Sequence, residues 1–295
     1  MTQPRSFAMS QWDVFSSRPL AGNSVAVFAD GRGLSDVEMQ SIAKEMNLSE
    51  TTFILPGDAV TERDRGIRVR IFTVREELPF AGHPTLGTAF ALTSVNRAAQ
   101  VALELNVGKV PVHFEEKTGH RFGEMTQVDP SFGRRHDREA VARANGLRLE
   151  DLDDSLPIET VSTGMPFVIT PIKSLSAMQN LQIDPIGSAE YLAKTESKFF
   201  YFVCRETVDR EARLHARMFF YSVEDPATGS AAGCTAAWMV AHGIAEAEEC
   251  VLIEQGLEMK RPSQLFVRAA RRDNRIVNVR VGGHSVEILR GEVFL

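Results

Sequence analysis

The chain has few cysteines, and their number and spacing exclude several kinds of site. Among 295 residues only Cys204, Cys234 and Cys250 are cysteines, and they show neither a CxxC spacing nor an obvious pairing. Such usage is typical of a protein from a reducing compartment. Residues 1–15 lack the apolar core of a signal peptide, so we expect a cytoplasmic protein.

Basic clusters and cofactor-binding motifs are also absent from the sequence. A net charge of −6 without a basic run argues against a nucleic-acid partner. The chain has no GxGxxG or P-loop for a nucleotide, no GxSxG for a serine nucleophile, and no metal-ligand spacing among its histidines. We therefore expect an enzyme or binding protein that uses no metal and no cofactor.

Two long stretches contain no charged side chain when histidine is counted as neutral. They cover residues 78–96 and 226–245. Gly, Ser, Thr, His and Pro interrupt both, which argues against membrane spans and favours helices that are buried on every side. Each stretch is entered through a tight turn, in FAGHPTLGTA at 80–89 and EDPATGSAAG at 224–233.

The similarity of the two stretches indicates an internal duplication. They lie about half the chain length apart, and a weaker similarity at about the same separation links GNSVAV at 22–27 to GMPFVI at 164–169. We expect two related halves, each with one buried central helix, although chance similarity between Gly/Ala-rich helices is an alternative. A chain of 295 residues also exceeds a comfortable single core.

The polar segment that begins near Asp129 is where we place the domain boundary. The first domain would comprise residues 1–126, completed by a C-terminal strand at 286–295, and the second residues 127–285. Short strand patterns surround both expected central helices, without the alternation of a doubly wound sheet. The fold class expected is therefore α+β, with two barrel-like domains.

Local patterns place several further elements. SDVE at 35–38 is a capping box for a helix that ends near Asn47, and a strand follows at 51–55. The C-terminal strands are expected at 265–269, 276–281 and 286–289, with Gly282-Gly283 as a turn.

Three titratable residues occupy positions suited to chemistry. Glu50 lies at the junction of the capped helix and a buried strand, where a partly desolvated carboxylate suits a general base; a solvated loop glutamate is the alternative. His83 begins the first uncharged helix, where neutral imidazole is favoured, and Asp225 has the corresponding place in the second half. For both, a structural helix cap is the alternative.

The first turn of the second uncharged helix offers groups that could position a ligand. Gly229 and Ser230 would present backbone N–H groups at the positive end of the helix dipole, an arrangement that receives anions. Close helix packing through small residues is the alternative interpretation.

Four segments together resemble the PhzF-like phenazine-biosynthesis family. They are NLSETTF at 47–53, ELPFAGHPTLGTA at 77–89, EDPATGSAAG at 224–233, and QGLEM at 255–259 followed by RPS at 261–263. The resemblance covers essentially the whole chain, in order. It implies a diaminopimelate-epimerase-like fold of two similar α+β barrels, with the active site in the cleft between them.

The resemblance also implies site residues and an activity. Glu50 would be the acid/base that moves a proton between carbons, and His83 and Asp225 would hold polar groups of the substrate. The substrate-binding residues implied are Ser49, Gly82, Gly229 and Ser230. The characterised family member isomerises trans-2,3-dihydro-3-hydroxyanthranilate without a cofactor and is a homodimer.

Epimerases of the same fold use two cysteines, one at each central helix. Here those positions read AGH at 81–83 and DPA at 225–227, and Cys234 lies further along its helix. Two-cysteine racemisation is therefore not expected. The function predicted is a cofactor-independent isomerase, a homodimer that acts on a small carboxylated substrate. A non-catalytic small-molecule-binding or regulatory protein is the alternative.

Overall fold

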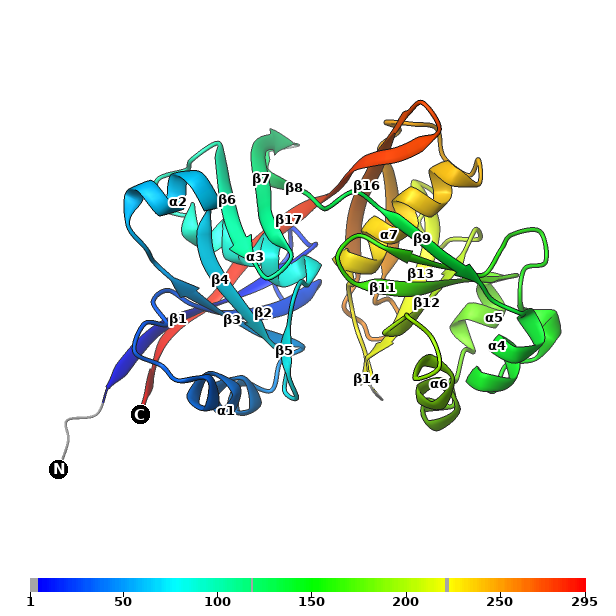
Figure 1. The fold of residues 1–295 in the computed structure, drawn as a ribbon, viewed down its shortest axis with the longest axis horizontal. Helices are drawn as coiled ribbons and strands as arrows, with labels where there is room; N and C mark the ends of the chain where they lie inside the picture. The colour runs from blue at the N-terminus through cyan, green and yellow to red at the C-terminus, as the bar shows by residue number, and fades with distance from the viewer. Residues whose placement is uncertain (1–4, 118, 221–222) are drawn as a thin grey trace. The chain divides into compact units, whose positions relative to one another are not determined.

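The computed structural model describes residues 5–117, 119–220 and 223–295 (Figure 1). Contacts divide the chain into two compact units: Met1–Thr126 with Gly282–Leu295, and Gln127–Val281. That these units are independent folding domains stays a prediction. Among the helices of the described residues, none has the length and apolar character needed to span a membrane.

In the first unit a sheet closes on itself around helix α3, as Figure 1 shows. The strands pair in the order β17–β1–β2–β3–β4–β6–β7–β8, and β8 pairs again with β17. The elements are β1 (Ser6–Val14), β2 (Asn23–Phe28), α1 (Asp36–Met46), β3 (Glu50–Leu55), α2 (Ala59–Arg65), β4 (Ile67–Phe72), β5 (Glu77–Leu78), α3 (Gly82–Leu92), β6 (Gln100–Leu105), β7 (Gly108–Lys117) and β8 (His120–Thr126), together with the part of β17 (Arg275–Phe294) that begins at Gly282.

Helix α3 is the core of the first unit. All its residues from Gly82 to Phe90 are buried, and it contacts β1, β2, β3, β6 and β8. This is the helix expected from the first uncharged stretch, and its environment explains the lack of charge. Helix α1 lies outside the closed sheet and has the predicted capping box, Ser35 with Glu38, and Asn47 as its C-cap.

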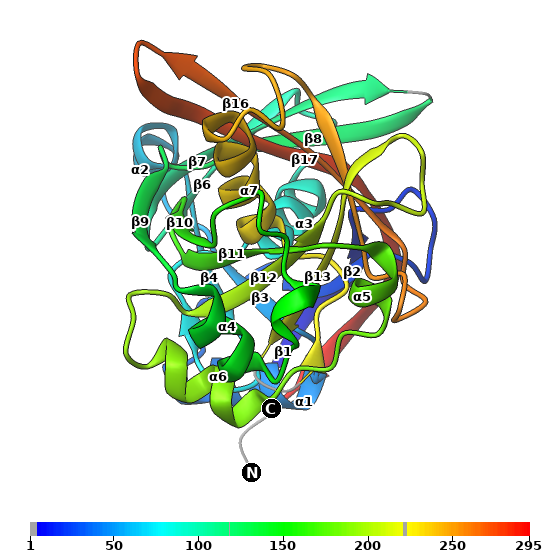
Figure 2. The same cartoon turned by 90° about the vertical axis from the view of Figure 1, so that its right-hand side faces the viewer.

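The second unit is also built around one buried helix. Helix α7 is buried from Gly229 to Val240 and packs against β16, β11 and β10; Figure 2 shows it above the paired helices α4 and α6. The strand order is β9–β10–β11–β12–β13–β15–β16. The elements are β9 (Ser131–Arg135), α4 (Arg138–Asn145), a 3₁₀ turn η1 (Leu149–Asp151), β10 (Glu159–Ser162), β11 (Pro166–Ile172), α5 (Leu175–Gln179), α6 (Pro185–Leu192), β12 (Phe199–Cys204), β13 (Ala212–Phe220), β14 (Val223–Glu224), α7 (Gly229–Ala241), β15 (Val251–Gln255) and β16 (Ser263–Arg272).

The predicted turn at Gly282-Gly283 is wrong. Strand β17 continues through both glycines from Arg275 to Phe294. A Cβ atom on Gly282 would lie 2.6 Å from Cζ of Phe122, so the glycine is required where the strand passes closely over that ring. A glycine in a strand thus marks a close approach of the backbone, and not a reversal of the chain.

Candidate active site

Glu50 and His83 lie together inside the first unit. Glu50 is the first residue of β3 and His83 the second of α3, and only 6% and 3% of their surfaces are exposed. The imidazole Nε2 lies 3.3 Å from the Oε2 of Glu50. A carboxyl group at the start of a strand therefore faces an imidazole at the start of the central helix.

The imidazole of His83 is held in its neutral form. Burial lowers its pKa to about 3, and a hydrogen bond with the backbone of Ser24 opposes that shift only in part. On the other side of the ring, Asn23 Nδ2 lies 3.1 Å from Nδ1. The close approach of Nε2 to the Glu50 carboxyl group is favourable when one proton lies between them, on the ring or on the carboxyl group. The contact between Nε2 and Oε2 is close but lacks the alignment of a hydrogen bond, so the structure places the Glu50 carboxyl group beside a neutral imidazole.

Asp13 stabilises the segment that carries Asn23. It is fully buried on β1, and its Oδ2 accepts a hydrogen bond from Leu20 N at 2.7 Å. Its Oδ1 accepts one from Ser24 Oγ at 2.6 Å. These bonds fix the turn on both sides of Asn23. Sequence reasoning missed Asp13 and Asn23, because a buried aspartate on a strand gives no sign of its partner; GNS at 22–24 was the available signal.

Asp225 lies in the second unit, between β14 and α7. Its side chain is mostly buried, Thr228 Oγ1 donates to its Oδ2 at 2.6 Å, and its own N–H donates to Met218 O at 2.8 Å. The N-cap of α7 is Thr228, so Asp225 does not cap the helix directly. The carboxylate is therefore held before the helix, beside its positive end.

The other predicted binding residues also adjoin these places in the chain. The first intrahelical bond of α7 runs from Ala232 N to Thr228 O at 2.9 Å, so the amides of Gly229 and Ser230 are not used within the helix. Gly82 opens α3, and Ser49 directly precedes Glu50. Their roles as substrate-binding residues stay predictions.

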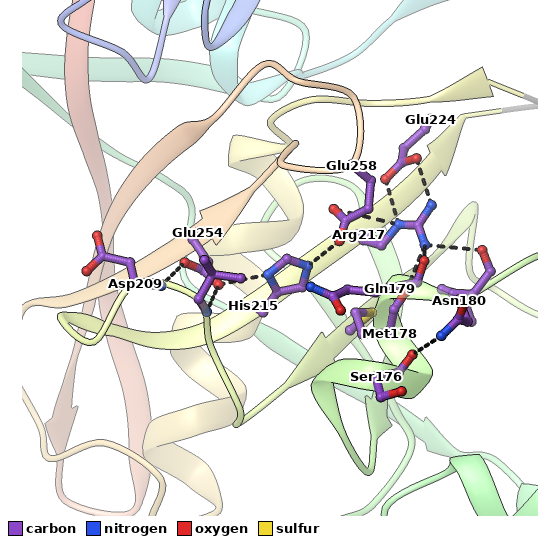
Figure 3. A network of polar contacts seen from close by, with 12 residues as sticks. Ser176, Met178, Gln179, Asn180, Asp209, His215, Arg217, Glu224, Glu254 and Glu258 are labelled. Atoms are coloured by element: carbon purple, nitrogen blue, oxygen red, sulfur yellow. Dashed lines mark hydrogen bonds and ion pairs between the residues drawn. The ribbon is translucent and has the colours of Figure 1, made fainter.

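A buried ionic network lies beside the Asp225 segment, and sequence reasoning missed it (Figure 3). His215 contacts Glu254 through Nδ1 at 2.8 Å and Glu258 through Nε2 at 3.1 Å. Arg217 donates two bonds to Glu224, at 2.7 and 2.8 Å. The available signal was the spacing of two along β13, which puts His215 and Arg217 on one face of a strand.

Burial alone would lower the pKa of His215, but its bonds to Glu254 and Glu258 raise it to about 9. His215 is therefore a cation held between two carboxylates. The thiol of Cys234 is the opposite case, because burial within α7 raises its pKa to about 12 and keeps it neutral. Among the described residues, no group of three or more His, Cys, Asp and Glu is arranged to hold a metal ion.

Solved structures first define the class of protein. The fold is that of the PhzF and epimerase-like proteins: a Bacillus anthracis protein of the PhzF family matches with a TM-score of 0.88 at 28% identity, over 99% of this chain and 100% of that one. A hydroxyproline epimerase from Agrobacterium vitis matches with a TM-score of 0.70 at 11% identity, a likeness of fold alone. The expected α+β fold with barrel-like sheets is confirmed.

Sequence comparisons then give the family. The family described as phenazine biosynthesis-like protein matches residues 12–291. The trans-2,3-dihydro-3-hydroxyanthranilate isomerase of Pseudomonas chlororaphis is 36% identical over 291 residues, 96% of this chain and 98% of that protein. An uncharacterized isomerase of Mesorhizobium japonicum is 36% identical over 301 residues, 96% of this chain and 97% of its own. The chain belongs to the PhzC-PhzF family and is an isomerase.

Proposed function

We propose that this isomerase moves a proton between two carbons of a small carboxylated substrate, with Glu50 as the general acid and base. The observation that carries the proposal is that Oε2 of Glu50 lies 3.3 Å from Nε2 of His83, with both side chains buried. Isomerisation leaves the atoms of the substrate unchanged, so every proton removed must be returned. A single carboxyl group that accepts a proton and gives it back supplies this chemistry.

The steps balance without an added reactant. The carboxylate of Glu50 takes a proton from one carbon, and the electron pair left behind shifts along the conjugated system. The protonated carboxyl group then returns the proton to a second carbon. Because His83 is neutral, it adds no positive charge that would hold Glu50 permanently as the carboxylate. Burial of both groups keeps bulk water from the proton in transit.

The substrate we propose is trans-2,3-dihydro-3-hydroxyanthranilate or a close relative, on the strength of the relative from Pseudomonas chlororaphis. In the second unit, the amides of Gly229 and Ser230 suit a carboxylate, and Asp225 suits a hydroxyl or amino group. In the first unit, Ser49 and Gly82 adjoin the Glu50–His83 pair and are the remaining proposed binding residues.

We also propose that the protein acts as a homodimer and without a metal or organic cofactor, as the family resemblance implies. Sedimentation velocity tests the first point, with a species of twice the 32.7 kDa chain mass expected. Dialysis against a chelator tests the absence of a metal, with unchanged turnover expected.

The function is tested by offering the purified protein trans-2,3-dihydro-3-hydroxyanthranilate and following the double-bond protons by NMR. We expect a new isomer of unchanged mass, formed in many turnovers per enzyme. Failure to convert it, with conversion of another carboxylated cyclic diene, would correct the substrate and keep the reaction. Conversion of none of these compounds would contradict the proposed reaction.

A further inference from the structure

The segment QGLEM at 255–259 has no role in the reaction described so far, yet its first residue has an unusually complete set of contacts. Gln255 ends β15 and its side chain is wholly buried in the second unit. Its Oε1 accepts hydrogen bonds from Tyr201 Oη at 3.0 Å and from Thr228 N at 3.1 Å. Its Nε2 donates to Asp225 O at 2.8 Å and to Thr228 Oγ1 at 3.0 Å.

These four bonds fix the orientation of the amide. The Thr228 N–H only donates and the Asp225 carbonyl only accepts, so Oε1 must face the first and Nε2 the second. Both donor hydrogens and both acceptor positions of Gln255 are then in use. A buried amide satisfied in this way cannot rotate without losing several hydrogen bonds.

The same bonds orient the hydroxyl hydrogen of Thr228 toward the Asp225 carboxylate. Thr228 Oγ1 accepts from Gln255 Nε2, which leaves its own hydrogen to be donated to Asp225 Oδ2 at 2.6 Å. The hydrogen bonds therefore run in one direction, from the Gln255 amide through the Thr228 hydroxyl to the Asp225 carboxylate. Because the Gln255 amide cannot turn over, it fixes the direction of the hydrogen bond that the Asp225 carboxylate receives from Thr228.

The next residue brings the two backbones together. Gly256 has φ +79°, and a Cβ atom there would lie 2.5 Å from both Pro226 O and Arg261 O. No side chain fits between this segment and the turn that follows Asp225. Gln255 thus binds the turn through its side chain. Gly256 has no side chain and therefore allows the two backbones to lie this close.

We propose that Gln255 is a positioning residue for substrate binding: with Gly256, it holds the Asp225–Thr228 turn so that the Asp225 carboxylate keeps a single orientation. This inference rests on the proposed function, in which Asp225 holds a polar group of the substrate. It assigns a specific task to the glutamine and glycine of the C-terminal signature segment.

The kinetic test is a double-mutant cycle. Gln255→Met removes the four hydrogen bonds at similar volume, and Gln264→Met on the exposed face of β16 is the matched control. We expect Gln255→Met to lower kcat/KM about tenfold or more, since bonds of this kind contribute about 1 kcal/mol each. In the background of Asp225→Asn the same change should cost less than about twofold, because its effect acts through Asp225. Equal losses in both backgrounds would overturn the proposal.

A second measurement needs no substrate and separates this inference from the reaction itself. Amide hydrogen exchange should be faster at Thr228 in Gln255→Met, because Gln255 is the acceptor for that N–H. It should be unchanged in Gln264→Met. If the wild-type protein converts no candidate substrate, the proposed function fails while exchange at Thr228 still tests the positioning. If Gln255→Met does not fold, Gln255→Glu replaces it, because it keeps the acceptor and loses the donor to Asp225 O. Normal Thr228 protection in Gln255→Met would overturn the inference, as would unchanged kcat/KM in a folded Gln255→Glu.

Discussion

Nε2 of His83 lies 3.3 Å from Oε2 of Glu50, with both side chains buried in the first unit. The relationship depends on two element boundaries, because β3 begins at Glu50 and α3 begins one residue before His83. Asn23, the first residue of β2, lies on the far side of the ring. Three separate segments therefore combine to hold one carboxyl group beside a neutral base.

The neutrality of His83 predicts the shape of the pH profile. Burial lowers its pKa to about 3, so the ring stays uncharged as the pH falls through 6.5, where an ordinary histidine gains a proton. A plot of log kcat/KM against pH should have no inflection near 6.5 that His83 causes. His83→Ala should weaken substrate binding and turnover together. An inflection near 6.5 that disappears in His83→Asn would contradict this account of the ring.

His215 predicts how stability depends on pH. Its pKa is raised to about 9 in the folded protein by Glu254 and Glu258, against about 6.5 in an unfolded chain. The folded state therefore binds the proton more tightly. The resulting stability is fully present below pH 6.5 and is lost as the pH rises from about 6.5 to 9. Urea unfolding at several pH values should show a loss of the order of 1–3 kcal/mol across this range.

The matched variant for that measurement is His215→Asn, which has no proton to lose. It should be less stable than the wild type at pH 6, and its free energy of unfolding should change less between pH 6.5 and 9. Identical pH slopes for the two proteins would show that His215 is not the titrating group.

Strand β17 offers a test of its close approach to Phe122. Gly282→Ala should destabilise the protein by about 1–3 kcal/mol, because the new methyl group would lie 2.6 Å from a ring carbon that is itself buried. Gly291→Ala is the control in the same strand, since its Cβ position has no heavy atom within 4 Å. Equal melting temperatures for the two variants would argue against the packing described.

The start of α7 predicts an effect on binding. Gly229→Val places a branched side chain at the amides proposed to receive the substrate carboxylate, and should raise KM about tenfold or more. Ala241→Val, at the last residue of the same helix, should leave KM unchanged. Calorimetry with a substrate analogue measures the corresponding affinity of each variant. Equal affinities of Gly229→Val and Ala241→Val would exclude Gly229 from the site.

Much of the fold could be predicted because it depends on local signals. The lack of charge at 78–96 and 226–245 predicted α3 and α7, and SDVE at 35–38 predicted the cap of α1. Gly282 was misinterpreted as part of a turn. Sequence alone does not distinguish a glycine needed for a turn from one needed where the backbone packs against an aromatic ring, here that of Phe122. Helix α6 was missed although Asp184 caps it and Pro185 opens it, a pattern typical of a helix start.

The candidate site could be predicted only where family motifs marked it. Glu50, His83 and Asp225 lie in such motifs. Asn23 contacts His83 and Gln255 contacts Asp225 from segments distant in sequence, and Asp13 acts only on the segment beside Asn23 through Ser24. Polar residues buried on strands have no periodicity that reveals what they contact. For the same reason, His215 and Arg217 looked like ordinary residues of an alternating strand.

The central claim is that Glu50 transfers the proton, and Glu50→Gln tests it most directly. The substitution keeps the size of the side chain and removes its ability to accept and return a proton, while Glu45→Gln on the exposed side of α1 is the control. With a confirmed substrate in D₂O, NMR follows isomer formation and deuterium incorporation together. We predict that Glu50→Gln binds substrate nearly as the wild type does but loses about 10²–10⁴-fold in turnover, with Glu45→Gln unaffected. Isomerisation by Glu50→Gln at the wild-type rate would contradict the account.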